Sequence, residues 1–399
     1  MTEKVFTIEK VVFGGKGISR DLQKVTFVPY TLAGEKVRAR IKKDRRDYIE
    51  AEATEILEPS PDRVPPDCRY FGTCGGCQIS HASYRKQLAM KEETLRETLR
   101  RNHLEIPEVQ IIPGKPFGYR HRARLKFDAK HRRLGFFQAE SNQVTDIHEC
   151  LCLTPGLNRL LHLLRNRLLT AHIPGLTEID CYENHRGETA AFFNASLPTE
   201  SRAPLKKETR VHVLRESDAV GIRMRFRNYE LPMHPDIFLQ ANPDLWNVLV
   251  QEVESHQDNS KNRVAVELYS GAGFFTVPLS KKFQKIIAVE ENEAAVRFAK
   301  ENHSSPTIEW VCDKAETFDI PEGTTAVIVD PPRAGLHRNV VRGLLTKSVE
   351  RITYVSCDCA SFARDVKNLR ERYRLSKLTL IDLFPQTYHF ETVALLAKI

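Results

Sequence analysis

The sequence predicts an α/β protein with a Rossmann-like C-terminal domain, an N-terminal β-barrel and an α+β central domain. Three patterns support this prediction. Apolar and polar residues alternate up to residue 58, a proline-rich segment follows, and short apolar runs alternate with helical stretches in the last third. A chain of 399 residues exceeds one ordinary core. We expect three domains, at 1–59, 60–230 and 231–399.

The first 58 residues have the pattern of an all-β domain. The strand-like segments are 5–13, 24–30, 35–44 and 48–57, and the turn-prone stretches GGKGIS and LAGE lie between them. This spacing indicates a small barrel. The stretch PSPDRVPPD, with four prolines in nine residues, predicts the linker that follows.

The middle of the chain mixes helical and strand-like signals. Helical periodicity is found over 84–102 and 156–172, and strand-like alternation over 119–129 and 133–138. The last third differs, because its short apolar runs are typical of buried parallel strands joined by crossover helices. These runs are 264–269, 285–290, 307–311, 325–330 and 352–356. They predict a doubly wound sheet.

Charge and hydropathy narrow the class of protein. Sixty Lys and Arg against 52 Asp and Glu give a net charge of +8, and basic residues cluster between Lys36 and Arg46 and between Lys115 and Arg133. Basic side chains beside aromatic ones suit single-stranded or looped nucleic acid, although a solvated charged face would look the same. No apolar run reaches the roughly 20 residues of a membrane span, and the start lacks a signal-peptide pattern. We expect a cytoplasmic protein with no membrane partner.

Three of the nine cysteines have the spacing of a metal centre. Cys68, Cys74 and Cys77 form C-x5-C-x2-C, and Cys150 is the expected fourth ligand, with Cys152 left open as its rival. Thiolates alone suit an iron-sulfur cluster or structural zinc, and one triplet with a distant fourth cysteine favours the cluster. Two other cysteines, Cys181 and Cys312, fit small core residues instead.

A glycine-containing turn after the first apolar run of the last third predicts a cofactor site. The run ends at Tyr269, and Gly271-Ala272-Gly273 follows. Because Thr276 stands where a dinucleotide fingerprint has its third glycine, a pyrophosphate cradle is not favoured. Glu290 ends the second run, where a carboxylate can accept hydrogen bonds from ribose hydroxyls.

Two neighbouring segments complete the predicted cofactor site. Asp313, after the third run, is placed to reach an adenine edge. Phe238, Gln240 and Asn242 lie at the entry to the domain, on a segment that could close over the cofactor.

The fourth and fifth apolar runs deliver the residues that carry chemistry. Asp330 is followed by two prolines that fix the backbone, and the fifth run leads into Ser356, Cys357 and Asp358. A cysteine at the start of a helix can have its thiolate favoured by the helix dipole. Sequence physics alone leaves Cys357 and Cys359 as alternative nucleophiles.

With these residues the chain resembles the uridine-C5 RNA methyltransferases, specifically the 23S ribosomal RNA type that carries a TRAM domain and an iron-sulfur cluster. The resemblance rests on DPPR and SCD motifs and covers nearly the whole chain. It implies S-adenosylmethionine and a [4Fe-4S] cluster as cofactors. The implied residues are Gln240, Tyr269, Glu290 and Asp330 for S-adenosylmethionine, Cys68, Cys74, Cys77 and Cys150 for the cluster, Cys357 as nucleophile and Glu391 as general base.

The implied mechanism is covalent. Cys357 attacks C6 of the uracil, C5 accepts the methyl group and Glu391 removes the C5 proton, while Arg333 and Gln240 are candidates to stabilise developing charge. The target uridine must be flipped or already looped out. Ribosomal RNA is the expected partner, with transfer RNA as the alternative and no obligate protein partner. The rival predictions are a nitrogen-directed methyltransferase and a non-catalytic RNA-binding or iron-sulfur sensor protein.

Overall fold

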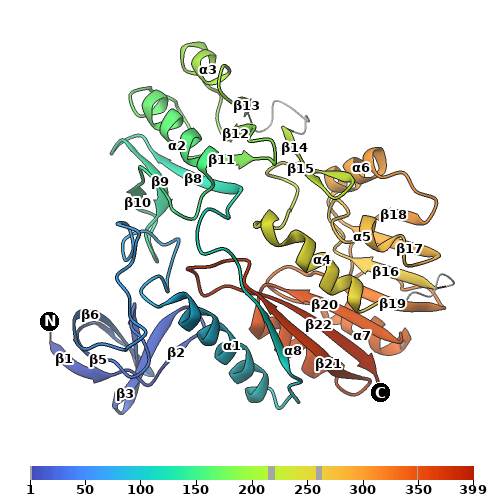
Figure 1. The fold of residues 1–399 in the computed structure, drawn as a ribbon, viewed down its shortest axis with the longest axis horizontal. Helices are drawn as coiled ribbons and strands as arrows, with labels where there is room; N and C mark the ends of the chain where they lie inside the picture. Colours follow the sequence, from blue (N-terminus) through green and yellow to red (C-terminus); the bar gives the residue numbers. More distant parts are fainter. Residues whose placement is uncertain (1, 214–220, 258–262, 348) are drawn as a thin grey trace.

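The computed structural model describes residues 2–213, 221–257, 263–347 and 349–399, and it arranges them in three lobes (Figure 1). The N-terminal lobe, in blue, lies at one side, the green lobe lies above it, and the yellow-to-red lobe with the C-terminus lies opposite. In the part of the chain that the structure describes, no helix combines the length and apolarity that a membrane span needs.

The first lobe is a six-stranded sheet that curls around a core containing Phe6, Val28 and Val37. Its strand order is β1-β5-β6-β4-β3-β2. The strand predicted over 5–13 is divided in two, because the chain changes partner: β1 pairs with β5, and β2 pairs with β3. The strands are β1 (Glu3–Thr7), β2 (Lys10–Val12), β3 (Lys16–Leu22), β4 (Lys24–Pro29), β5 (Lys36–Asp44) and β6 (Tyr48–Glu58).

The second lobe is a six-stranded sheet in the order β10-β9-β8-β11-β12-β13, with helices against it. The helix predicted over 156–172 is confirmed as α2; Thr154 caps it by accepting a hydrogen bond from the Leu157 amide. The elements are β8 (Arg122–Asp128), β9 (Arg133–Phe137), β10 (Val144–Asp146), α2 (Pro155–Leu168), β11 (Glu178–Glu183), β12 (Thr189–Phe193), α3 (Thr199–Leu205) and β13 (Arg210–Val213).

The third lobe contains the predicted doubly wound sheet, and all five predicted strands are present. The strand order is β18-β17-β16-β19-β20-β22-β21-β7, in which the first five strands are parallel and β22 is antiparallel to both of its neighbours. The elements are β14 (Ile222–Phe226), β15 (Tyr229–Met233), η1 (Pro243–Leu245), α4 (Trp246–Ser255), β16 (Val264–Leu268), α5 (Thr276–Leu279), β17 (Lys285–Glu290), α6 (Glu293–Asn302), β18 (Ile308–Cys312), β19 (Thr324–Val329), α7 (Arg338–Lys347), β20 (Arg351–Ser356), α8 (Cys359–Leu369), β21 (Tyr373–Ile381) and β22 (Glu391–Lys398).

Both faces are covered in the middle of this sheet, which explains why β16, β17, β19 and β20 are largely apolar and buried. Along β19, Val327 and Val329 face the core shared with α7 and α8, while Ala326 and Ile328 face the core shared with α4. The predicted α/β class, with an N-terminal barrel before a Rossmann-like domain, is confirmed.

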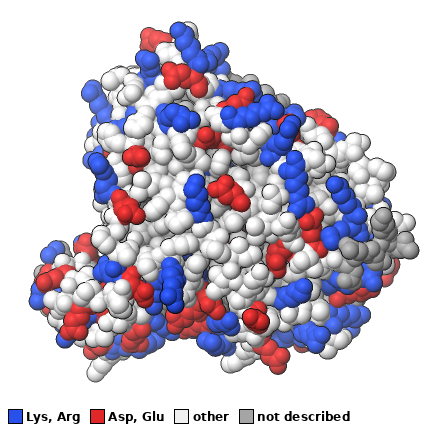
Figure 2. Space-filling model, viewed as in Figure 1, with Lys and Arg blue, Asp and Glu red and all other residues white. Residues whose placement is uncertain are grey.

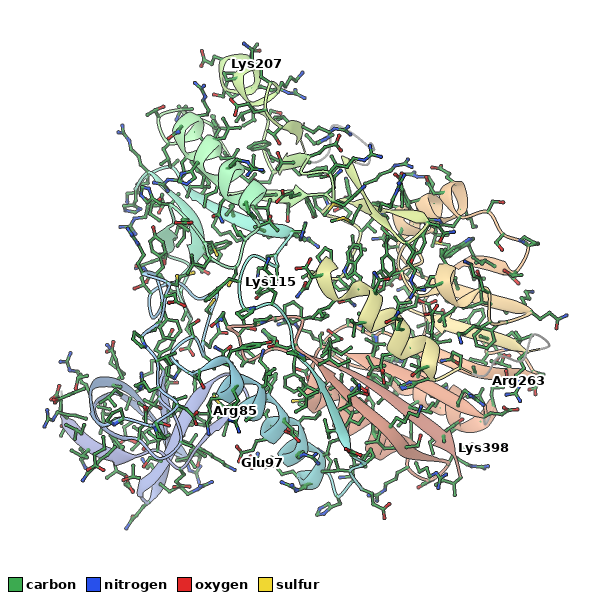
Figure 3. The ribbon with its side chains drawn as sticks, in the orientation of Figure 1. Arg85, Glu97, Lys115, Lys207, Arg263 and Lys398 are labelled. Carbon is green, nitrogen blue, oxygen red and sulfur yellow. The ribbon has the colours of Figure 1, made fainter. Side chains whose placement is uncertain are left out.

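Two elements from the middle of the sequence join the third lobe. Helix α1 (Tyr84–Arg101) packs against α8, and β7 (Val109–Ile112) pairs with β21. Glu97 on α1, labelled in Figure 3, also forms an ion pair with Lys10 of the barrel. The exact domain boundaries at 59/60 and 230/231 stay predictions, but in space α1 and β7 belong with the C-terminal sheet.

Candidate active site

Tyr269, Glu290 and Asp330 come together at the carboxyl edge of the parallel strands. Leu268 on β16 pairs with Val289 on β17 and with Val329 on β19, so the next residue of each strand lies at the same level. This edge is where open α/β sheets bind ligands. The structure therefore brings together three of the residues that the resemblance implies for the cofactor.

Cys357 and Glu391 lie opposite each other at the same edge. Strand β22 runs antiparallel to β20, and Ser356 pairs with Thr392. Thr392 Oγ1 also donates a hydrogen bond to the Ser356 carbonyl at 3.1 Å. One step beyond this pair, the antiparallel ladder places Cys357 across from Glu391.

The carboxylates beside Cys357 are held in an unfavourable environment for negative charge. Burial raises the pKa of Glu391 well above its ordinary value, the nearby Asp330 adds to this, and Arg333 opposes it. Burial also raises the pKa of Asp330 to about 7, against a hydrogen bond from Gln240 that lowers it. One oxygen of Glu391, a residue only 1% exposed, has no hydrogen-bond partner among the described residues. Such groups mark sites of proton transfer or ligand binding.

The expectation that a helix dipole favours the Cys357 thiolate is wrong. Helix α8 begins at Cys359, and its N-cap is Asp358, whose carboxylate accepts hydrogen bonds from the amides of Ala360 and Ser361 at 3.1 and 2.8 Å. Asp358 therefore occupies the positive end of the helix. Burial raises the pKa of Cys357 to about 12, and the charges of Glu391 and Asp330 add to this.

Cys359, the alternative nucleophile, lies in a different environment. It is 2% exposed and belongs to the core between the sheet and its helices. Its sulfur lies 3.7 Å from Thr98 Oγ1 on α1. Cys357, by contrast, is half-buried at the strand edge beside Glu391, Asp330 and Arg333.

A small pocket lies at the glycine turn. Gln240, Tyr269, Ser270 and Asp330 are among its lining residues. Gln240 Nε2 donates a hydrogen bond to Asp330 at 3.1 Å, which orients that carboxylate. Ser270 Oγ is buried and lacks a partner among the described residues, so a bound ligand could satisfy it.

Glu290 has its carboxylate fixed beside this pocket. Its two oxygens accept hydrogen bonds from the amides of Gly271 and Asn292, both at 2.9 Å. A carboxylate can accept about four hydrogen bonds, so two sites remain for ribose hydroxyls.

The two segments expected to border the cofactor differ in how they are held. Asp313 accepts hydrogen bonds from the Lys314 amide and from Thr317, which turns its carboxylate toward its own chain. On the other segment, Phe238 is 67% exposed while Asn242 is fully buried and donates to the Leu383 carbonyl at 3.2 Å.

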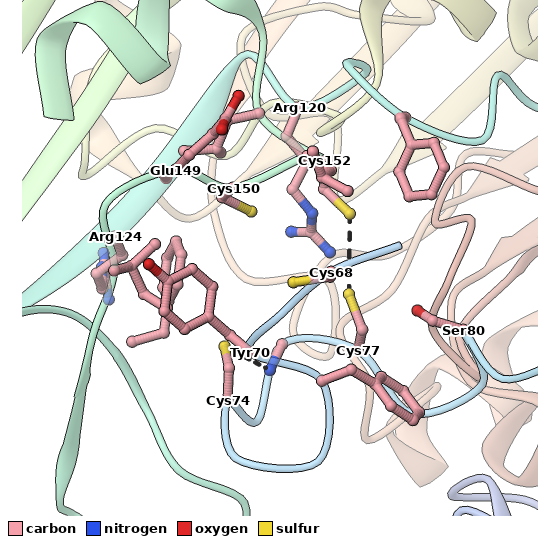
Figure 4. Close-up of a pocket in the computed structure, with 18 of the residues that line it drawn as sticks. Cys68, Tyr70, Cys74, Cys77, Ser80, Arg120, Arg124, Glu149, Cys150 and Cys152 are labelled. Carbon is pink, nitrogen blue, oxygen red and sulfur yellow. Dashed lines mark hydrogen bonds between the residues drawn. The ribbon is translucent and has the colours of Figure 1, made fainter. Parts of the chain in front are cut away.

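Five cysteines line one cavity of about 410 Å³ between the loop at residues 68–80 and the second lobe. Figure 4 shows the sulfur atoms of Cys68, Cys74, Cys77, Cys150 and Cys152 directed into a common space. The sulfurs of Cys77 and Cys152 are 3.8 Å apart, and the side chains of Cys150 and Cys152 also interact. Within the described residues, no three Cys, His, Asp or Glu side chains converge as they would on a single metal ion.

The two cysteines predicted to be core residues behave differently. Cys181 is 2% exposed within the core of the second lobe, which confirms that prediction. Cys312 is exposed, so the prediction is wrong for it. Cys312 is the last residue of β18, which is the edge strand of the sheet.

The basic cluster between Lys36 and Arg46 is largely neutralised. Five of its seven cations form ion pairs with carboxylates, four of them on the neighbouring strand β6: Lys36–Glu58, Arg38–Glu55, Arg40–Glu3, Lys42–Glu52 and Lys43–Glu50. In the second cluster, Arg124 and Lys126 pair with Glu178. Basic and acidic side chains accordingly lie interspersed on the face shown in Figure 2. The first cluster therefore does not form an open cationic patch on the barrel.

Sequence reasoning assigned no role to α1, although this helix holds the segment that leads to Glu391. Gln87 bonds to Gln386, and Lys91 forms an ion pair with Asp382. A signal was present, because Lys91 falls on the buried helix face with Leu95 and Leu99, where a lysine needs a partner.

Arg120 was also missed as a residue of the cysteine cavity. Its guanidinium lies among the cysteines in Figure 4 and stands 5.8 Å from the ring centroid of Phe384. Arg120 therefore connects the cavity with the segment before Glu391.

Comparison with known proteins gives consistent results over the chain. A family model described as tRNA (Uracil-5-)-methyltransferase matches residues 205–312 and 322–399, and the TRAM domain model matches residues 6–54. An uncharacterized RNA methyltransferase of Aquifex aeolicus is 34% identical over 98% of this chain and 97% of its own length. A 23S rRNA (uracil(1939)-C(5))-methyltransferase of a Marinomonas species is 32% identical over 99% of this chain and 95% of its own.

A solved structure matches over the same extent. The Pyrococcus abyssi tRNA (uracil-54, C5)-methyltransferase, in complex with S-adenosyl-L-homocysteine, has a TM-score of 0.78 and 26% sequence identity. The match covers 98% of this chain and 99% of that one.

Proposed function

The chain belongs to the tRNA (uracil-5-)-methyltransferase family, and we propose that Cys357, Glu391 and Asp330 carry out its reaction here on 23S ribosomal RNA. The activity is methylation of C5 of uracil in RNA, with S-adenosylmethionine as methyl donor. The predicted family, RNA partner and methyl donor are confirmed at this level. The individual residue roles, the RNA molecule and the iron-sulfur cluster are proposals.

The observation that carries the proposal is the meeting of Cys357 and Glu391 across β20 and β22. C5 of uracil is a weak nucleophile, so covalent attack at C6 is needed to activate it. A thiol and a carboxylate facing each other supply both the nucleophile and the base that such a route requires. The buried setting also limits access of water to the intermediate.

Each step can be assigned to one side chain. The Cys357 thiolate bonds to C6, and the electron pair of the C5–C6 double bond moves to C5. C5 then takes the methyl group, whose bond to the sulfonium sulfur of the donor breaks with its electron pair staying on that sulfur. Glu391 removes the C5 proton, the double bond re-forms, and the pair of the C6–sulfur bond leaves with Cys357. Arg333, which offsets the negative charge around Cys357 and Glu391, is placed to stabilise the ring oxygens as they gain charge.

The residues around the glycine turn fit S-adenosylmethionine. Glu290 retains acceptor sites for ribose hydroxyls, and Tyr269 and Gln240 line the pocket beside Asp330. S-adenosylmethionine supplies an electrophilic methyl group when bound. The role of the protein is to hold that donor at the strand edge where Cys357 lies.

The cysteine cavity fits a [4Fe-4S] cluster better than a zinc ion. A cluster of eight atoms is bound by thiolates spread over its surface, whereas zinc draws four ligands toward one point. Five thiols line the cavity of about 410 Å³, which leaves room for the larger group. Cys68, Cys74, Cys77 and Cys150 are the proposed ligands, and the cluster would join the loop that follows the barrel to the second lobe.

The barrel is the proposed RNA-binding accessory. A groove of about 950 Å³ between the barrel and the cysteine loop is lined by Lys16, Lys43, Tyr30 and Tyr388, among others. Phe13 of the barrel contacts the Tyr388 ring edge-on, with centroids 5.0 Å apart. RNA in this groove would thus reach the segment that carries Glu391. Exposed ion pairs contribute little free energy, so phosphates can replace their carboxylates.

Trapping the covalent adduct tests the proposed chemistry. Fluorine at C5 cannot be removed as a proton, so wild-type protein with S-adenosylmethionine and 5-fluorouridine RNA should give an adduct that survives denaturing electrophoresis. Cys357→Ala should form none. Cys359→Ala is the matched control and should retain the adduct. A Cys357→Ala adduct would overturn the assignment, and methylation without any adduct would favour a nitrogen-directed enzyme.

The RNA is identified separately, by mapping 5-methyluridine in ribosomal and transfer RNA from cells lacking the gene. We expect the loss of one modified site in 23S ribosomal RNA. Loss from transfer RNA instead would transfer the proposal to the uridine-54 substrate named for the Pyrococcus relative.

A further inference from the structure

Gln386 lies at the centre of the segment 382–390, which joins β21 to β22 and ends immediately before Glu391. The residue is 4% exposed. Its φ angle is +71°, in the left-handed region that residues other than glycine rarely adopt. A buried glutamine in this conformation must be held there by its surroundings.

Five hydrogen bonds hold Gln386, and all of them come from the middle of the sequence. The amide group of Gln87 on α1 bonds twice, by accepting from Gln386 N and donating to Gln386 Oε1, both at 3.0 Å. Gln386 Nε2 donates to the Pro116 carbonyl at 3.3 Å. The Gln386 carbonyl accepts from the amides of Gln78 and Ile79 at 3.1 and 3.2 Å. Every polar group of Gln386 therefore has a partner.

Two of these donors connect Gln386 to the cysteine loop. Gln78 and Ile79 directly follow Cys77, whose sulfur lines the cysteine cavity. Tyr119, next to Arg120 of the same cavity, donates its hydroxyl to the Pro385 carbonyl at 2.8 Å. The segment before Glu391 is thus attached to the cavity wall on two sides.

The path from Gln386 to Glu391 is short and tightly bonded. Thr387 is buried and donates to the Phe384 carbonyl, and the His389 amide donates to Thr387 Oγ1 at 3.2 Å. Glu391 then begins β22, paired with Ile381 at the end of β21. Because these hydrogen bonds restrict the segment, a displacement at Gln386 would also displace the Glu391 carboxylate.

We propose that Gln386 is a positioning residue for the proton-abstraction step: by fastening the 382–390 segment to Gln87 and to the cysteine loop, it fixes the Glu391 carboxylate at the C5 proton. This inference rests on the proposed function. In the step concerned, the C5–H bond breaks and its proton passes to Glu391. The electron pair forms the C5–C6 double bond, and the sulfur of Cys357 leaves with the pair of the C6–S bond.

The step can be isolated by using two RNAs. With 5-fluorouridine RNA, the rate of adduct formation reports cofactor binding, attack and methyl transfer. With ordinary uridine RNA, the fraction of enzyme held as adduct during turnover reports slow proton abstraction. A loss of overall structure lowers both signals, whereas misplacement of Glu391 lowers turnover while the adduct accumulates.

The variants are Gln386→Ala, Gln87→Ala and the double variant, with Gln23→Ala as control. Gln23 is also a glutamine of positive φ, on an exposed turn of the barrel. For Gln386→Ala we expect turnover to fall roughly tenfold, as for the loss of a buried hydrogen-bonded group, with adduct accumulating on uridine RNA. The rate on 5-fluorouridine RNA should stay within about twofold, and the double variant should be no worse than the single, because both remove the same interaction.

Two results would contradict the proposed role of Gln386. Unchanged turnover, or a parallel loss on both RNAs in protein of normal thermal stability, would overturn the role of Gln386. If Gln386→Ala does not fold, Gln386→Gly accepts the positive φ without strain and removes the same side-chain bonds. If the wild-type protein itself forms no adduct on 5-fluorouridine RNA, the proposed function fails, and that result is distinct from wild-type-like behaviour of the variants.

Discussion

Lys91 on α1 and Asp382 at the end of β21 form an ion pair of 2.6 Å although their side chains are only 1% and 0% exposed. Tyr84 donates its hydroxyl to the other Asp382 oxygen at 3.0 Å, and Lys91 also donates to the Phe384 carbonyl at 3.1 Å. Burial of charge is costly, and these additional hydrogen bonds offset the cost. The pair fixes the start of the segment that ends at Glu391.

Removing one partner of this pair should destabilise the protein strongly. In Lys91→Met the Asp382 charge is left buried without its cation, so we expect the free energy of unfolding to fall by about 3 to 5 kcal/mol. Denaturant titration followed by fluorescence measures the change. The double variant Lys91→Met with Asp382→Asn should recover part of the loss. A Lys91→Met protein as stable as the wild type would contradict the role assigned to the pair.

The hydrogen bond from Gln240 to Asp330 predicts a pH effect on cofactor binding. Burial raises the pKa of Asp330 to about 7, and the Gln240 bond lowers it. In Gln240→Leu this lowering is lost, so the pKa of Asp330 rises further and the carboxylate ionises only at higher pH. The pH below which the affinity for S-adenosylmethionine falls, measured by calorimetry, should therefore be higher in Gln240→Leu than in the wild type. An equal or lower pH in the variant would show that Asp330 does not control binding.

Glu391 should affect the two halves of the reaction in opposite directions. Burial raises the pKa of Cys357 to about 12, and the Glu391 charge adds to it, so Glu391→Gln should lower this pKa and favour the thiolate. At pH 9, adduct formation on 5-fluorouridine RNA should be faster than in the wild type. On uridine RNA the same variant should stall as a methylated adduct, because the base is missing. Rapid turnover of Glu391→Gln would remove Glu391 from the mechanism.

The sequence predicted the strand edge well because a buried parallel strand has a simple signature. Apolar runs ended at Glu290, Asp330 and Ser356, and the structure brings all three ends to one edge. The contacts between residues far apart in the sequence could not be predicted. The attachment of Gln386 to Gln87 joins residues 299 positions apart, and no local pattern specifies such a contact.

Strand register and helix capping explain the surroundings of the β5 cations and of Cys357. Lysine and arginine on β5 face glutamates on β6, and Lys43 opposite Glu50 and Arg38 opposite Glu55 follow from the strand register. The alternation of both strands could have indicated this neutralisation. For Cys357 the following helix was expected to stabilise the thiolate, but Asp358, the better N-cap residue, takes that position.

The cysteine cavity yields a prediction that separates the two rival fourth ligands. Cys150 lies near Cys68, Cys74 and Cys152, and the sulfur of Cys152 also lies 3.8 Å from that of Cys77. If Cys150 is the ligand, Cys150→Ser should lose most of the iron and of the broad visible absorption in anaerobically purified protein, and Cys152→Ser should keep both. Exposed Cys312→Ser is the matched control for a thiol outside the cavity.

Two other outcomes of this experiment are informative. Iron lost from Cys152→Ser but not from Cys150→Ser would exchange the two roles, and zinc in place of iron in the wild type would replace the proposed cluster with a structural ion.

Removal of the iron by a chelator tests whether the cysteine loop affects turnover. Because the Gln78 and Ile79 amides bond to the Gln386 carbonyl, a disordered cysteine loop should release the segment before Glu391. Iron-free protein should then accumulate adduct on uridine RNA, as Gln386→Ala does, whereas normal turnover without iron would show that the cysteine loop holds its shape through its protein contacts alone.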